Sequence, residues 1–115
     1  MARIKIEGLD KLQKKLKDNV TLDDVKRVVK TNGGQLRVKM KRNAEFKKGY
    51  QTGTTKRSID LTITDAGFTA EVKPTTEYSP YLEYGTRKME AQPFVWPAFK
   101  EQEEKFERDM QRLVR

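Results

Sequence analysis

A long amphipathic helix dominates what this chain can fold into. Thr21 can cap such a helix, and Asp23 and Asp24 suit the positive end of its dipole. A helix over residues 22–46 would be about 37 Å long, which makes it the largest element of a chain of 115 residues. Apolar residues recur behind Thr21 at steps of three and four, the period of one helix face, with one longer gap after Val29; they are Leu22, Val25, Val29, Leu36 and Met40.

Two adjacent glycines, Gly33 and Gly34, interrupt the apolar pattern of this helix. Together they lower helix stability by about 2 kcal/mol relative to Ala. They therefore mark a kink, a break, or a place where another part of the backbone comes close.

A β-hairpin follows the helix. Apolar and polar residues alternate over residues 58–64 and again over 68–72, and Asp65-Ala66-Gly67 between them has turn chemistry. Pro74 ends the second strand. A lone hairpin is not stable in water, so it needs a covering helix or a neighbouring subunit. The residues that we expect this packing to bury are Ile59, Leu61, Ile63, Phe68 and Val72.

The remaining segments complete a single α+β domain over residues 1–115. We expect a small antiparallel sheet, the hairpin plus one or two strands, packed against the long helix and a C-terminal helix. Pro97 suits the first turn of that last helix. The other predicted segments are an edge strand at 4–6, a short amphipathic helix at 9–16, a mobile loop at 47–56, and a strand or helical turn at 78–86.

The composition limits the chemistry that the chain can carry out. It has no Cys and no His, so catalysis would rest on carboxylates, Lys or Tyr. Neighbouring carboxylates such as Glu103 and Glu104 point to different faces of a helix and do not converge. We expect no enzymatic activity and no cofactor. A small nuclease-like or host-modifying enzyme is an alternative, and it would need a metal ion held by carboxylates.

No apolar run approaches the roughly 20 residues of a membrane span, and no signal-peptide core follows Met1. We therefore expect a soluble chain that is made in the cytoplasm and does not contact a membrane.

Positive charge is concentrated in the first half of the chain. Residues 1–57 carry 17 Lys and Arg against 6 Asp and Glu, a net charge of +11, whereas residues 58–115 have a net charge of −3. This asymmetry suits head-to-tail self-association, an acidic partner or nucleic acid, and it also serves solubility alone. A basic module that binds nucleic acid non-specifically is therefore an alternative function. The residues that could face DNA or an acidic partner are Arg37, Lys39, Lys41, Arg42, Lys47 and Lys48.

Aromatic residues gather in the segment 78–99. Six of the ten aromatics of the chain lie there, interleaved with polar residues and prolines. Some of them must form the core of so small a domain. An irregular segment that is rich in aromatics also suits a protein interface.

This segment resembles the signature of the small tail-component proteins of long-tailed bacteriophages, also called tail-completion, neck or head–tail joining proteins. The resemblance rests on Glu83-Tyr84-Gly85-Thr86, preceded by Tyr81, and on Gln92-Pro93-Phe94 followed by Pro97-Ala98. Thr52-Gly53 before the hairpin resembles a second block of that family. The Pro-x-Asp that usually precedes this block is replaced here by Lys48-Gly49-Tyr50-Gln51.

The resemblance implies a structural role in a phage or prophage virion, without enzymatic activity. Such proteins form a ring, most often of six copies, between the tail tube or tail terminator and the head connector, and DNA passes through the ring. The residues that would shape a contact with a subunit or neighbour are Tyr81, Glu83, Tyr84, Gly85, Thr86, Gln92, Pro93, Phe94 and Pro97.

Overall fold

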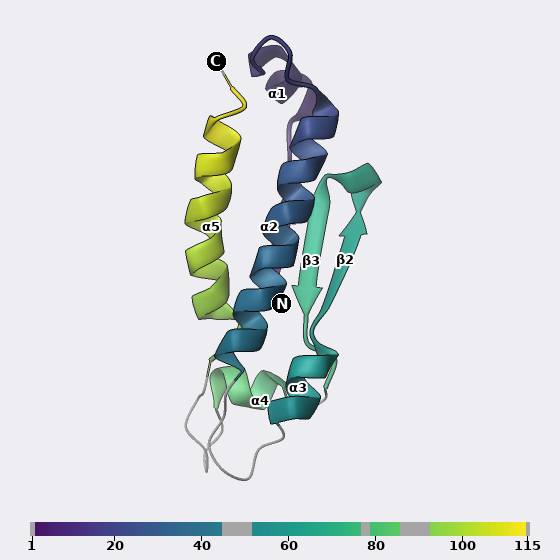
Figure 1. The fold of residues 1–115 in the computed structure, drawn as a ribbon. Helices are drawn as coiled ribbons and strands as arrows, with labels where there is room; N and C mark the ends of the chain where they lie inside the picture. The colour runs from purple at the N-terminus through teal and green to yellow at the C-terminus, as the bar shows by residue number, and fades with distance from the viewer. Residues whose placement is uncertain (1, 45–51, 77–78, 86–92, 115) are drawn as a thin grey trace.

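The computed structural model describes residues 2–44, 52–76, 79–85 and 93–114, and the structural statements below concern these residues. A long helix, α2, lies between a sheet on one side and the last helix, α5, on the other, with α3 and α4 together at one end (Figure 1). The elements are β1 (Ala2–Lys5), α1 (Leu9–Lys15), α2 (Leu22–Asn43), α3 (Thr52–Ser58), β2 (Asp60–Thr64), the 3-10 turn η1 (Asp65–Gly67), β3 (Thr69–Lys73), α4 (Ser79–Tyr84) and α5 (Trp96–Gln111).

The sheet has three antiparallel strands in the order β1-β3-β2, so the predicted α+β class is confirmed. The hairpin and the N-terminal edge strand are confirmed as well. Val72 of the central strand pairs with Ala2 on one side and Leu61 on the other. The expectation that Ile63 is buried is wrong, since 39% of this residue is exposed. Ile63 lies on the outer strand of the hairpin, whereas α2 packs mainly over the neighbouring strand β3.

The helix α2 runs through Gly33 and Gly34 without a break. The double glycine instead marks a close approach of the sheet. A Cβ atom added to Gly33 would lie 2.8 Å from the Cβ of Ala70 and 3.0 Å from Cδ1 of Leu61. A Cβ atom added to Gly34 would meet nothing within 4 Å. Gly33 therefore lets α2 sit directly on β3 and β2, and Gly34 takes no part in that contact.

The predicted start of α2 is confirmed. The Asp24 carboxylate accepts a hydrogen bond of 2.8 Å from the Thr21 backbone N–H, as in a capping box. The helix ends at Asn43, before the predicted residue 46.

Two segments are helical where the sequence predicted a loop or left a strand and a helical turn as alternatives. Residues 52–58 form α3, so the predicted loop is wrong for 52–56, and its part at 47–51 lies outside the described residues. Of the two alternatives for the segment after Tyr78, the helical turn is correct, since Ser79–Tyr84 forms α4.

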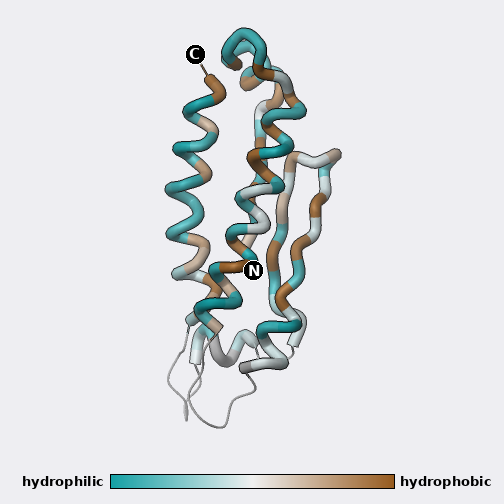
Figure 2. Tube along the Cα trace, viewed as in Figure 1, coloured by the Kyte–Doolittle hydropathy of each residue, from teal (hydrophilic) through white to brown (hydrophobic). Residues whose placement is uncertain are grey.

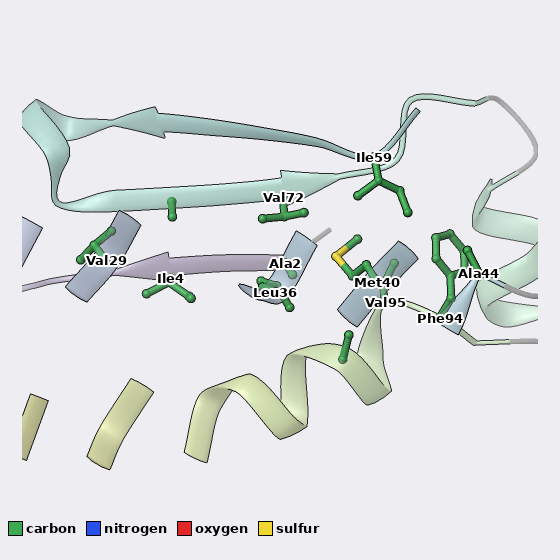
Figure 3. Packing of buried hydrophobic residues seen from close by; sticks show 12 residues of the cluster. Ala2, Ile4, Val29, Leu36, Met40, Ala44, Ile59, Val72, Phe94 and Val95 are labelled. Atoms are coloured by element: carbon green, nitrogen blue, oxygen red, sulfur yellow. The ribbon is translucent and has the colours of Figure 1, made fainter. Parts of the chain in front are cut away.

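The core lies where α2, the sheet and the start of α5 meet (Figure 3). Leu36, Met40, Ile59, Val72 and Phe94 are fully buried there. A second cluster around Leu16, Val25 and Phe68 joins α1 and α2 to the C-terminal end of the chain, where the Lys17 N–H donates a 2.8 Å hydrogen bond to the Leu113 carbonyl.

The contact between α2 and α5 includes buried polar side chains beside the apolar Ala98, Phe99 and Phe106. The tube of α5 is hydrophilic along most of its length (Figure 2). Asn32 and Gln102 are both fully buried, and the Gln102 amide donates to the side-chain oxygens of Asn32 and Gln35. The Asn32 amide donates to the Val28 carbonyl at 2.9 Å and to the Asp109 carboxylate at 3.0 Å. These hydrogen bonds between buried polar side chains fix the register of the two helices, and the buried Gln102 Oε1 is left without a hydrogen-bond partner among the described residues.

Replacing Asp109 with Asn is expected to lower the free energy of unfolding by about 1 kcal/mol at neutral pH. Burial by itself raises the pKa of Asp109, but the hydrogen bonds from Lys105 (2.7 Å) and Asn32 outweigh it, so the pKa of this carboxyl lies below its usual value. A carboxyl with a lowered folded-state pKa stabilises the fold above its unfolded pKa of about 4. This stabilisation is lost as the pH falls through the folded-state pKa.

Urea unfolding measured from neutral pH down to acid tests this prediction. The difference in stability between the wild type and D109N should shrink below about pH 4. Asp18→Asn, at an exposed position, is the control and should leave the stability almost unchanged. A difference for D109N that stays constant with pH would contradict the role given to the Asp109 carboxylate.

Candidate interaction surface

The two parts of the sequence signature meet through the carboxylate of Glu83. This residue lies in the last turn of α4, and one of its oxygens accepts hydrogen bonds of 2.9 Å from the backbone N–H groups of Phe94 and Val95. Its other oxygen accepts a bond of 3.1 Å from the N–H of Trp96. The first N–H groups of a helix have no partner within the helix, and a negative charge suits this end of the helix dipole. Glu83 thus caps α5 from a separate element.

Phe94 and Gly85 also have roles within the chain. Phe94 is fully buried in the core, near Ala44 and Met40 (Figure 3). Gly85 follows the last residue of α4 with φ of +78°, a left-handed conformation that only glycine adopts without strain. Pro97 lies in the first turn of α5, as predicted. The signature therefore joins α4 to α5 and sets the angle between them.

Two aromatic side chains of this junction face outward. Tyr84 is 80% exposed and Trp96 is 58% exposed, beside the partly buried Phe99. The rings of Trp96 and Phe99 are 6.1 Å apart, and Lys100 Nζ lies 5.5 Å from the Trp96 ring centre. We call Tyr84, Trp96 and Phe99 the aromatic surface. Large exposed aromatics gathered in one place are typical of sites that bind proteins.

Tyr84 lines two hollows of the protein surface. One, of about 210 Å³, is lined by Arg3, Glu83, Tyr84, Val95, Trp96 and Phe99. The other, of about 290 Å³, shares three of these residues and is completed by Lys73, Pro74, Thr75, Thr76, Ser79 and Pro80. Arg3 is held in place by the Glu71 carboxylate, to which its Nε donates a hydrogen bond of 3.1 Å.

The predicted signature residues are brought together only in part. Glu83, Tyr84, Gly85, Pro93, Phe94 and Pro97 gather at the α4–α5 junction, and Tyr81 lies in α4. Thr86 and Gln92 lie outside the described residues. Trp96 was not predicted as a site residue. No sequence signal separated it from the neighbouring Phe94 and Val95, because its exposure depends on how the start of α5 meets the core.

The predicted basic residues do not lie on one face of α2. The Arg37 Nε donates a 2.9 Å hydrogen bond to the Ile59 carbonyl, at the entrance to the hairpin. On the opposite side, Lys39 and Arg42 lie 3.7 Å and 3.0 Å from the carboxylate of Glu101 in α5. Lys41 has no ion pair with any residue that the structure describes. Lys47 and Lys48 lie outside the described residues.

The described part of the chain contains no cluster of three acidic side chains placed to hold a metal ion. None of its helices is both long enough and apolar enough to span a membrane.

The structure is a small α+β domain that exposes large aromatic side chains on one surface. A model of the family described as "Bacteriophage HK97-gp10, putative tail-component" matches residues 7–85. The chain belongs to this family of phage tail components. The match ends at Gly85, so it includes the Glu83-Tyr84 pair, while Phe94 and α5 lie beyond it. No curated protein matches the chain, and no solved structure matches it either.

Proposed function

We propose that this protein is a non-enzymatic structural subunit of a phage or prophage virion that completes the end of the tail and joins it to the head connector. Its membership of a tail-component family supports a place in the tail. The observation that carries the proposal further is the exposure of Tyr84 and Trp96 on a junction that Glu83 holds rigid. A rigid aromatic surface is suited to docking against a preformed assembly.

In this role the protein acts as one subunit of a ring, with six copies in the virion. Its neighbours are the head-connector protein on one side and the tail-tube or tail-terminator protein on the other. The aromatic surface contacts one of these neighbours. DNA passes through the ring, and basic residues of α2 contribute positive charge near its path.

Electron microscopy of particles from the parent phage with this gene deleted is the test. DNA-filled heads separate from free or overlong tails are expected, and supplying the wild-type gene should restore joined virions. Joined virions in the deletion strain would overturn the proposal.

Complementation with a Tyr84→Ser, Trp96→Ser double variant tests the aromatic surface itself. These exposed side chains contribute little to folding, so the variant should fold normally yet fail to restore joined particles. An Ile63→Ser variant removes an exposed apolar side chain that lies away from this surface, on the outer strand β2. It is the matched control for contact with the head and tail neighbours, and tails carrying it should still join heads.

A further inference from the structure

The outward face of α2 has a feature that the fold of one chain does not explain. Glycine disfavours a helix, yet Gly34 stands in the middle of α2, where an added Cβ atom would meet nothing within 4 Å. Its neighbour Gly33 is explained by the contact with the sheet, whereas Gly34 contacts nothing that requires glycine. A missing side chain on an open helix face lets a second helix approach closely.

The residues around Gly34 also suit a partner. Val38, one turn further along the helix, is 65% exposed. Lys30 and Lys41 lie on the same face and have no ion pair with any described residue. We call Lys30, Gly34, Val38 and Lys41 the outer face of α2. It combines a small apolar centre with positive charge at both ends, so a partner of acidic character fits it.

The same chain carries a complementary surface on α5. Glu104 and Glu107 are exposed and make no ion pair within the described ranges. Lys100 and Arg108 border them, which confines the negative charge to the middle of the helix. We call Glu104 and Glu107 the acidic pair of α5.

The acidic pair and Gly34 stand at the same level along the molecule. Glu101 pairs with Lys39 and Arg42, whereas Asp109 bonds to Asn32, so the stretch of α5 between them runs beside the middle of α2. A rotation about an axis parallel to these helices keeps every residue at its level. It would place Glu104 and Glu107 of one copy opposite Val38 and Gly34 of the next, between Lys41 and Lys30.

We propose that copies of this chain pack side by side, with the acidic pair of α5 in one copy against the outer face of α2 in the next. Gly34 admits the neighbouring helix, Val38 is shielded from water, and Lys30 and Lys41 meet Glu104 and Glu107. The two faces differ, so the contact is heterologous and repeats until a ring closes. This contact rests on the proposed function, because it specifies how neighbouring subunits of the ring meet. The contact is separate from the aromatic surface.

Disulfide trapping between separately prepared variants tests the contact. The chain has no Cys, so V38C and E104C each introduce a single thiol. After the two proteins are mixed at high concentration and oxidised, a mixed dimer can form only between copies. A disulfide needs Cα atoms about 4.4–6.8 Å apart, and it accumulates even from a weak association because the bond is covalent. The V38C–E104C dimer should exceed a V38C–D10C control, placed on exposed α1, at least about fivefold. Equal yields would overturn the inference.

Substitutions at Gly34 and at the charged residues provide a second readout. Gly34→Ala should raise the thermal stability of the single chain while it lowers the yield of the mixed dimer severalfold. Lys30→Glu and Glu107→Lys should each lower the yield, and a chain that carries both should recover it. If Gly34→Ala and the charge reversals leave the yield of the mixed dimer unchanged, that result would count against the contact. Failure of these tests would overturn only this interface, whereas joined virions from a gene deletion would overturn the proposed function.

Discussion

Replacing Glu83 with Ala is expected to lower the free energy of unfolding by about 3 kcal/mol. Among the side chains of the α4–α5 junction that lie outside the core, we expect Glu83 to have the largest effect on stability. Hydrogen bonds to a charged group contribute about 1.5–3 kcal/mol each, and they are not additive when they share one carboxylate. The Ala variant leaves the N–H groups of Phe94, Val95 and Trp96 without this acceptor. The first two belong to buried residues, where an unpaired donor is most costly.

Urea unfolding of Glu83→Ala, Glu83→Gln and Glu104→Ala measures this effect. The Gln variant retains one acceptor oxygen, so it should lose only about half as much stability as the Ala variant. Glu104 is an exposed Glu on α5 that has no hydrogen-bond partner among the described residues, and its replacement should change stability by no more than about 0.5 kcal/mol. If Glu83→Ala unfolds at the same urea concentration as Glu104→Ala, the cap does not hold α5.

Alanine at Gly33 should lower the free energy of unfolding by about 2 kcal/mol, whereas alanine at Gly34 should raise it by about 1 kcal/mol. Both substitutions favour a helix equally. At Gly33, however, the new methyl group would lie 2.8 Å from the Cβ of Ala70, which is attached directly to the backbone of β3 and cannot rotate away. The helix or the sheet must therefore shift. At Gly34 the new methyl group meets open space, so only the gain in helix propensity is felt.

Thermal and urea unfolding of the two variants, measured in parallel, compares the same chemical change at adjacent positions. The expected difference of about 3 kcal/mol is well above the error of such measurements. Equal stability of G33A and G34A would show that α2 does not sit on β3 as closely as described. It would also remove the reason for a glycine at position 33.

The elements with a strong local period could be predicted from the sequence. Alternation over residues 58–64 and 68–72 specified the hairpin, because side chains on a strand point to opposite faces in turn. Steps of three and four behind Thr21 specified α2. Residues 52–56 were predicted as part of a loop because the segment contains glycine and polar residues and has no periodicity, yet this stretch is helical and Thr55 is fully buried. Tertiary packing overrides weak local preference in such short segments.

The candidate site was predictable in its residues and unpredictable in its geometry. The signature identified Tyr84 and Phe94 as site residues. Only the fold determines that Phe94 is buried and Tyr84 is exposed. Arg37, Lys39 and Arg42 were grouped by their sequence proximity. Two sides of one helix separate them, and Ile59 and Glu101 engage them from different elements.

The sequence alone therefore determined the α+β class, the long helix and the hairpin, since each depends on a repeat of side-chain character over a few neighbouring residues. Only the tertiary structure decided that Gly33 is a contact with the sheet and Gly34 an open position. It also decided that Glu83 closes the start of α5. Both depend on segments far apart in the chain, 37 residues from Gly33 to Ala70 and 11 from Glu83 to Phe94, whose approach no local pattern encodes.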